Sequence, residues 1–220
     1  MTVGPPRVLL VTDSVFGDDV VLDCVRRVGG SLPRGEFGVQ LRDKRRPIVS
    51  LRVFAWQLRR ATQKVGASLF INGNAQLARD VGAEGVHLGT AAGTVARARA
   101  IFGRACWVSV AGHSDHDVRR AVGDGADAVL VSPVFDSRSH SPWRDREGER
   151  KVGRGVEAIR SARRAVPLES FLYALGGVTA DTATACAAAG ADGVALVRGL
   201  LGSAEPGRVA RAIHDAFDGR

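Results

Sequence analysis

Short runs of apolar residues alternate with segments of helical periodicity along the whole chain. An uninterrupted apolar run is typical of a strand buried on both faces, as strands are in a parallel sheet. The pattern predicts eight strands, at residues 7–11, 37–41, 68–71, 85–88, 106–110, 128–131, 171–175 and around 194. Apolar spacing and capping residues predict helices between them, including 18–28, 47–65, 75–81, 94–102, 114–122, one that starts at 179, and 206–217.

Repeated strand–helix units with right-handed crossovers build a parallel sheet. Eight units within 220 residues favour a closed barrel, so we expect an α/β protein with a single TIM (β/α)₈ barrel over residues 1–220. An open, doubly wound sheet is the structural alternative.

One long polar stretch interrupts this rhythm, at about 136–153, after the sixth predicted strand. It is rich in arginine, aspartate and glutamate. Loops of this length are usually functional or disordered. Because the stretch follows the carboxyl end of a strand, where barrels carry their sites, we expect it to act as a lid.

The composition is that of a globular protein, with 45% apolar and 25% charged residues, and the formal net charge is +8. The basic excess is almost all arginine, spread along several helices, and aromatic residues make up only 5%. This distribution argues against a nucleic-acid surface, which would need clustered charge and stacking rings. It favours attraction of anionic metabolites.

No apolar run is long enough to span a membrane, and no apolar leader precedes the first strand. The cysteines, Cys24, Cys106 and Cys186, are scattered and form no CxxC pair, so neither disulfides nor a zinc site is indicated. We therefore expect a cytoplasmic protein that binds no membrane, and its oligomeric state is left open.

Two glycines end the seventh strand and precede a helix that Thr179 can cap. Glycine lets backbone N–H groups approach a ligand, and a helix start attracts anions, so Gly176 and Gly177 are candidates for a phosphate site. The ordinary alternative is a strand-to-helix turn that binds nothing. Arg42 and Lys44 come just after the second strand, at the end of the barrel where sites lie. They either make the mouth of the barrel cationic or form an exposed charge pair without a function.

Several motifs in the expected order resemble the thiamine phosphate synthase/TenI superfamily. They are Gln40-Leu41-Arg42-Asp43-Lys44, Asn72, Gly85-Val86-His87-Leu88-Gly89, Ser109 with His113, Pro133-Val134-Phe135, Ala174-Leu175-Gly176-Gly177-Val178 and Gly190-Ala191-Asp192-Gly193-Val194-Ala195. The resemblance implies one of two reactions. The synthase joins hydroxymethylpyrimidine pyrophosphate to thiazole phosphate with Mg²⁺, whereas the TenI-type tautomerase aromatises a thiazole carboxylate phosphate by moving a proton, without a metal.

Departures from the synthase pattern favour the TenI-type branch. The synthase has an Asp after the third-strand Asn and another shortly after the fourth strand, both on Mg²⁺, but here those places read Gly73 and Thr90-Ala91-Ala92. Mg²⁺ needs oxygen ligands, usually carboxylates, and neither glycine nor alanine has a side chain that offers one. A synthase lysine in the sixth-strand loop is also missing from Ser137-Arg138-Ser139-His140, and Arg198 stands where the family usually has Ser. By contrast, Gln40 to Lys44 stay close to the synthase pattern.

His113 is the candidate for proton transfer, because imidazole titrates near neutral pH and the resemblance places a catalytic histidine there. His140 is its rival, and His87 is expected to be a hydrogen-bonded barrel residue. The resemblance implies a substrate-binding set and a phosphate-binding set. The first comprises Gln40, Arg42, Lys44, Asn72, Ser109, Ser137, Ser139 and His140, and the second comprises Gly176, Gly177, Gly193, Val197 and Arg198.

The sequence thus predicts a metal-independent thiazole tautomerase that binds a phosphorylated thiazole and needs no cofactor. Thiamine phosphate synthase is the alternative, and only that alternative calls for Mg²⁺. A third hypothesis is a non-catalytic member that binds the phosphorylated ligand or regulates.

Overall fold

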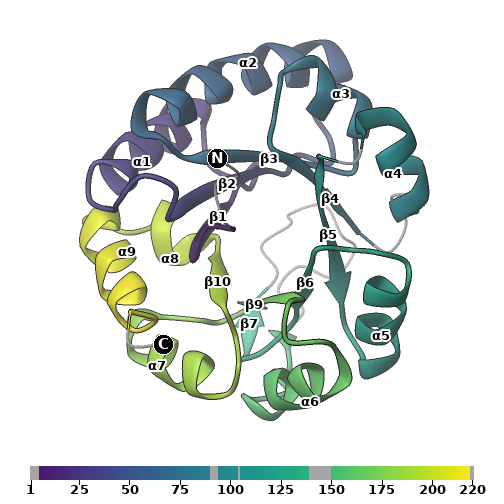
Figure 1. Cartoon of the computed structure of the whole chain (residues 1–220). Coiled ribbons are helices and arrows are strands. Elements are labelled where there is room, and N and C mark those ends of the chain that lie inside the picture. The colour runs from purple at the N-terminus through teal and green to yellow at the C-terminus, as the bar shows by residue number, and fades with distance from the viewer. Residues whose placement is uncertain (1–4, 90–93, 104, 139–149, 219–220) are drawn as a thin grey trace.

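Eight parallel strands close into a barrel in the order β1-β10-β9-β6-β5-β4-β3-β2 (Figure 1). The computed structural model describes residues 5–89, 94–103, 105–138 and 150–218. The barrel strands are β1 (Val8–Val11), β2 (Phe37–Leu41), β3 (Ser68–Asn72), β4 (Gly85–Leu88), β5 (Trp107–Gly112), β6 (Ala128–Val131), β9 (Phe171–Leu175) and β10 (Gly193–Leu196). The predicted α/β class and TIM barrel are confirmed.

Helices surround the barrel on its outside, as the view along its axis shows (Figure 1). They are α1 (Asp18–Gly29), α2 (Ile48–Val65), α3 (Ala75–Asp80), α4 (Val95–Phe102), α5 (Asp115–Gly123), α6 (Glu157–Ala165), α7 (Ala180–Ala188), α8 (Arg198–Leu201) and α9 (Pro206–Asp215). Asn74, Thr94 and Ser114 cap their helices through side-chain oxygens, and Thr179 forms a capping box with Thr182. No helix of the described chain is long and apolar enough to cross a membrane.

Apolar side chains pack much of the interior of the barrel. Phe70, Leu130 and Tyr173 belong to this inner cluster, and Trp107 packs against it. Position 85 requires glycine, because a Cβ on Gly85 would overlap the main-chain carbonyl of Trp107. A larger apolar cluster fills the space between the strands and the helices.

Two local features differ from the predicted elements. Strand β5 extends two residues beyond its predicted end, because Ala111 and Gly112 continue the pairing with Leu130 and Val131 of β6. This extension brings His113 directly to the end of the strand. In addition, the short helix α8 separates β10 from α9, where the sequence indicated only one final helix.

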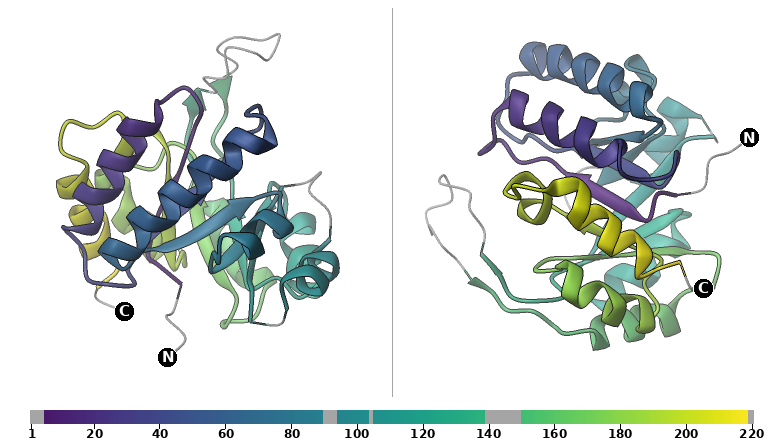
Figure 2. Two further views of the ribbon diagram at one scale, coloured as in Figure 1. Left: turned by 90° about the horizontal axis from the view of Figure 1, so that it is seen from above. Right: turned by 90° about the vertical axis from the view of Figure 1, so that its left-hand side faces the viewer.

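The ends of the predicted lid are held by regular structure. Strand β7 (Ser137–Arg138) pairs antiparallel with β8 (Arg150–Lys151), so the two ends of the segment 136–153 are joined to each other in a two-stranded ladder. The Gly153 N–H donates to Asp136 Oδ1 (2.7 Å), and the Gly155 N–H donates to the Val134 carbonyl (2.7 Å). Figure 2 shows this ladder on the side of the barrel away from the C-terminal end of α9. Residues 139–149, including Ser139 and His140, lie outside the described residues, and the lid stays a prediction.

Candidate functional site

A layer of polar side chains lies inside the barrel toward the carboxyl ends of the strands, which we call the upper end or mouth of the barrel. Gln40 and Asn72, on neighbouring strands, are joined because Asn72 Nδ2 donates to Gln40 Oε1 (3.2 Å). Next to them, His87 Nδ1 lies 3.0 Å from Ser109 Oγ. Gln40 Nε2 is buried and has no hydrogen-bond partner among the described residues. Since an unpaired buried donor is costly, this N–H₂ group can serve a ligand that enters from the mouth.

His87 is a neutral, structural member of this layer. Burial, together with the positive charges of Arg42, His113 and Lys44, lowers the pKa of His87 to about 3. The ring therefore carries no charge near neutral pH and cannot exchange protons there as an acid.

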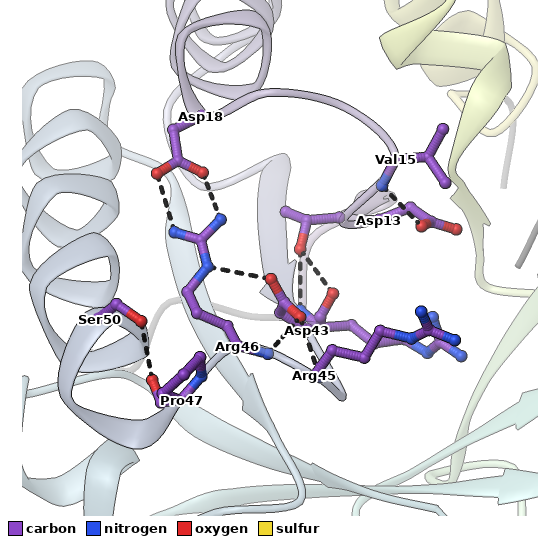
Figure 3. Close-up of polar contacts among 10 residues, drawn as sticks. Asp13, Val15, Asp18, Asp43, Arg45, Arg46, Pro47 and Ser50 are labelled. Carbon is purple, nitrogen blue, oxygen red and sulfur yellow. Dashed lines mark hydrogen bonds and ion pairs between the residues drawn. The ribbon is translucent and has the colours of Figure 1, made fainter. Parts of the chain in front are cut away.

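The turn after β2, which carries Arg42 and Lys44, is fixed to the turn after β1. The Arg42 N–H donates to Thr12 Oγ1 (2.9 Å), and Thr12 Oγ1 donates to the Arg42 carbonyl (3.2 Å). Asp43 accepts the backbone N–H groups of Arg45 (3.1 Å) and Arg46 (3.0 Å), as Figure 3 shows. The backbone of the cationic turn is thereby held in one conformation.

Arg46 anchors this turn to the helical shell. Its guanidinium donates to both oxygens of Asp18 (2.8 and 2.6 Å) and to Asp43 (3.0 Å), as Figure 3 shows. It also lies 4.7 Å from the ring centroid of Phe54. Hydrogen bonding to Asp18 raises the pKa of Arg46. Burial opposes ionisation of Asp43, but the N–H groups of Arg45 and Arg46 and the Arg46 guanidinium outweigh it and lower the pKa of Asp43.

Sequence reasoning missed Asp18, Asp43 and Arg46 as supports of the site. The spacing Asp-x-x-Arg at 43–46 indicates a local pair, but the contact with Asp18 joins residues 28 positions apart. Only the barrel brings the start of α1 beside the turn after β2, where α1 and α2 are neighbours.

His113 is oriented at the end of β5 by its neighbours. Its Nδ1 lies 3.0 Å from the carbonyl oxygen of Ser132. A carbonyl only accepts hydrogen bonds, so this contact places the proton on Nδ1 and leaves the Nε2 lone pair available to take a proton. The His113 carbonyl in turn accepts Arg154 Nη1 (3.1 Å). His140, the rival candidate for proton transfer, lies outside the described residues.

The paired glycines after β9 pack closely against the segment that follows β6. Gly176 and Gly177 both have positive φ, of 98° and 63°. A Cβ at Gly177 would lie 2.5 Å from the Asp136 carbonyl oxygen, so the close approach requires glycine. The Phe135 N–H donates to the Gly176 carbonyl (2.9 Å). In the described chain, the N–H groups of Gly177 and Val178 have no acceptor, which is the condition for an anion site.

The turn between β10 and α8, which holds Val197 and Arg198, adjoins this glycine turn. A Cβ built on Gly199 would lie 3.8 Å from the Val178 carbonyl oxygen. The two turns that barrels of this kind use for phosphate therefore lie side by side. Arg198 is exposed at the start of α8.

Gly193 is separated from this pair, and its predicted phosphate contact is wrong. It begins β10 at the bottom of the barrel, where it pairs with Tyr173. A Cβ there would lie 2.7 Å from the Arg7 carbonyl oxygen, so this glycine serves packing. At about 3.3 Å per strand residue, it lies roughly 13 Å from Val197.

Residues suited to Mg²⁺ are not found beside Asn72. Gly73 adopts a positive φ of 72°, and its N–H donates to the His87 carbonyl (2.8 Å). Asn74 Oδ1 accepts the Leu77 N–H (2.9 Å) as the cap of α3. The second position, Thr90-Ala91-Ala92, lies outside the described residues and carries no carboxylate in its sequence. The donors present therefore do not fit the magnesium ion that a synthase of this superfamily would require.

The fold and this mouth define a (β/α)₈-barrel protein with cationic and glycine-rich strand ends. A sequence model of the TMP-TENI family, described as thiamine monophosphate synthase, matches residues 8–200, and the chain belongs to this family of thiamine biosynthesis enzymes. The predicted superfamily is confirmed.

Among the proteins similar to it are the following two relatives and one solved structure. A thiamine-phosphate synthase of Methanoculleus marisnigri is 36% identical over 94% of this chain and 92% of its own length. One of Gloeobacter violaceus is 35% identical over 77% of this chain, which spans 47% of that relative. A thiamine phosphate pyrophosphorylase of Pyrococcus furiosus has the same fold, with a TM-score of 0.79, 21% identity and coverage of 96% and 95%.

Proposed function

We propose that this chain makes thiamine phosphate from hydroxymethylpyrimidine pyrophosphate and thiazole phosphate. The observation that carries the proposal is its similarity to relatives named thiamine-phosphate synthase, at 29–36% identity over most of its length. The sequence alone favours the tautomerase over the synthase, whereas the names of these relatives favour the synthase.

The mouth offers a place for each phosphate group. Arg42 and Lys44 follow β2 on a braced turn, and a guanidinium binds phosphate oxygens through two parallel hydrogen bonds. The unpaired N–H groups of Gly177 and Val178, beside the start of α8, suit the single phosphate of the thiazole. Inside the barrel, Gln40 Nε2 provides a buried donor that has no partner among the described residues.

In this reaction the thiazole nitrogen forms a bond to the methylene carbon of the pyrimidine. The bond from that carbon to the pyrophosphate oxygen breaks, and pyrophosphate leaves with the electron pair. The leaving group gains charge as the bond breaks, so cations fixed beforehand stabilise the transition state. Because Gly73 supplies no metal ligand, we assign this role to Arg42 and Lys44, on the braced turn after β2.

A first test measures pyrophosphate release from the two substrates. The wild-type chain is expected to keep its rate in EDTA, since its own cations hold the leaving group. Arg42→Ala is expected to lower kcat/KM by about 10²-fold or more, as loss of a charge-stabilising group does. Arg52→Ala on the outer face of α2 is the matched control, because Arg52 is exposed and pairs only loosely with Asp80 (3.6 Å). Absence of pyrophosphate release under all conditions would reject the synthase.

The second candidate is the TenI-type tautomerase, and the geometry of His113 favours it. With Nδ1 donating to the Ser132 carbonyl, Nε2 can remove a ring proton and return it to the exocyclic carbon. No metal is needed for such a transfer, in agreement with the missing carboxylate at Gly73.

His113→Ala is expected to lower the rate of thiazole aromatisation by about 10²–10⁴-fold, the range for a general base. His116→Ala, on the exposed side of α5, should leave the rate unchanged. The assay follows the absorbance of the aromatic thiazole carboxylate phosphate in EDTA. A chain that binds thiazole phosphate but catalyses neither reaction would be the non-catalytic member, and would refute both candidates.

A further inference from the structure

A second group of ionisable side chains lies at the end of the barrel opposite the mouth. It gathers His214, Asp215 and Asp218, at and just beyond the C-terminal end of α9, which Figure 2 shows away from the β7–β8 ladder. Ligand atoms of these three residues lie within 4.8 Å of one another. None of them takes part in the site described above.

His214 is buried in this group without a hydrogen bond. Only 8% of its side chain is exposed. Its Nδ1 lies 3.6 Å from Asp215 Oδ1 and 3.8 Å from Asp218 Oδ2, and its Nε2 lies 3.7 Å from Glu36 Oε2. These distances are too long for hydrogen bonds, so among the described residues the buried imidazole has electrostatic neighbours only.

Glu36 adds a second unsatisfied atom to the group. Its Oε2 is buried and has no hydrogen-bond partner in the described part of the chain. It lies 3.8 Å from Arg7 Nε as well as 3.7 Å from the imidazole. A buried carboxylate oxygen without a hydrogen-bond partner is costly, and this oxygen faces the imidazole of His214.

A divalent cation would satisfy this arrangement. Ligands that bind zinc at about 2.1 Å are separated by roughly 3.4 Å in tetrahedral geometry, which is close to the 3.6 and 3.8 Å measured from Nδ1. The carboxylates of Glu36, Asp215 and Asp218 and the guanidinium of Arg7 together carry a net charge of −2 when His214 is neutral. The mixture of imidazole and carboxylate suits a borderline transition metal rather than Mg²⁺.

The surrounding contacts also match a supported metal ligand set. Arg7 Nη1 donates to Asp218 Oδ1 (2.8 Å), which holds this aspartate while its Oδ2 faces the imidazole. Ligating histidines usually donate their other ring N–H to a carboxylate. Here Glu36 Oε2 lies 3.7 Å from Nε2, and a small movement would bring it to hydrogen-bond distance.

We propose that His214, Asp215 and Asp218 bind a divalent transition-metal ion of the zinc class, with Glu36 and Arg7 as supporting residues. The site is independent of the catalytic proposal. By joining α9 to the residues that precede β1 and β2, the ion would stabilise the closure of the barrel.

The test is a calorimetric titration of the metal-free full chain with Zn²⁺, repeated with Co²⁺ to record its visible absorption. One ion per chain is expected, with a rise in the melting temperature on binding. His214→Ala and Asp218→Asn are expected to weaken binding by about 10²-fold or more. Glu36→Gln is expected to weaken it by about 10-fold, as changes in supporting residues do.

His116→Ala and Asp181→Asn, on other helices, are the matched controls and should bind as the wild type does. Asp215→Asn provides a variant at an exposed position, where the fold is not at risk, and circular dichroism checks each chain. The proposal is overturned if the wild type binds no ion, or if the Asp215 and His214 variants bind Zn²⁺ with unchanged affinity.

Discussion

Replacing Arg46 by alanine is expected to lower the free energy of unfolding by about 2–3 kcal/mol, between the values for exposed and buried ion pairs. The Arg46 side chain is 22% exposed and the Asp43 side chain 6%, so the loss leaves a largely buried carboxylate without its cation. The bidentate contact with Asp18 and the position over Phe54 are lost as well. For a chain of this size, the melting temperature should fall by roughly 4–12 °C, measured by calorimetry.

Arg46→Ala should also reduce catalysis, because the turn that carries Arg42 and Lys44 loses its anchor. Arg52→Ala is the control, since the Arg52 side chain is 57% exposed and its loss should change the free energy of unfolding by under about 1 kcal/mol. If both variants unfold at the same temperature, the anchoring role of Arg46 is wrong. A stable Arg46 variant with normal activity would show that the turn holds its shape without the Arg46 side chain.

Gly177→Ala is expected to cost about 2–5 kcal/mol of unfolding free energy. An alanine with a left-handed backbone costs about 1–2 kcal/mol, and overpacking adds about 1–3 kcal/mol. Here the new Cβ would meet the Asp136 carbonyl oxygen at 2.5 Å and Phe135 Cβ at 2.8 Å. The turn must shift to relieve these contacts, and the affinity for thiazole phosphate should fall because the N–H groups of Gly177 and Val178 move with it.

Gly82→Ala separates the two causes. Gly82 has nearly the same φ, 62° against 63°, but nothing lies within 4 Å of its Cβ position. It should therefore show the backbone cost alone, with unchanged phosphate affinity. Chemical denaturation gives the stabilities, and titration with thiazole phosphate or inorganic phosphate gives the affinities. Equal losses of stability in the two variants would contradict the close packing at Gly177, and unchanged affinity in Gly177→Ala would contradict the anion site.

The candidate site was predictable where chemistry follows from the strand ends. Gln40, Asn72, Ser109 and His113 all come from the upper parts of neighbouring strands, and parallel strands bring those parts together. The phosphate role that the resemblance implies for Gly193 together with Val197 is wrong, although the two residues are close along the chain. A strand separates the two, and its two ends lie on opposite faces of the barrel.

The apolar periodicity by itself determined a parallel sheet covered by helices, since eight buried strands alternate with helical segments. The pairing of β1 with β10, which closes this sheet into a barrel, belongs to the tertiary structure. Only the tertiary structure decided how the mouth is supported. Arg46 meets Asp18 and His113 meets Ser132 across different strand–helix units, and no local pattern encodes such contacts. The same holds at the opposite end, where Arg7, Glu36 and His214 come together from distant parts of the chain because the barrel closes there.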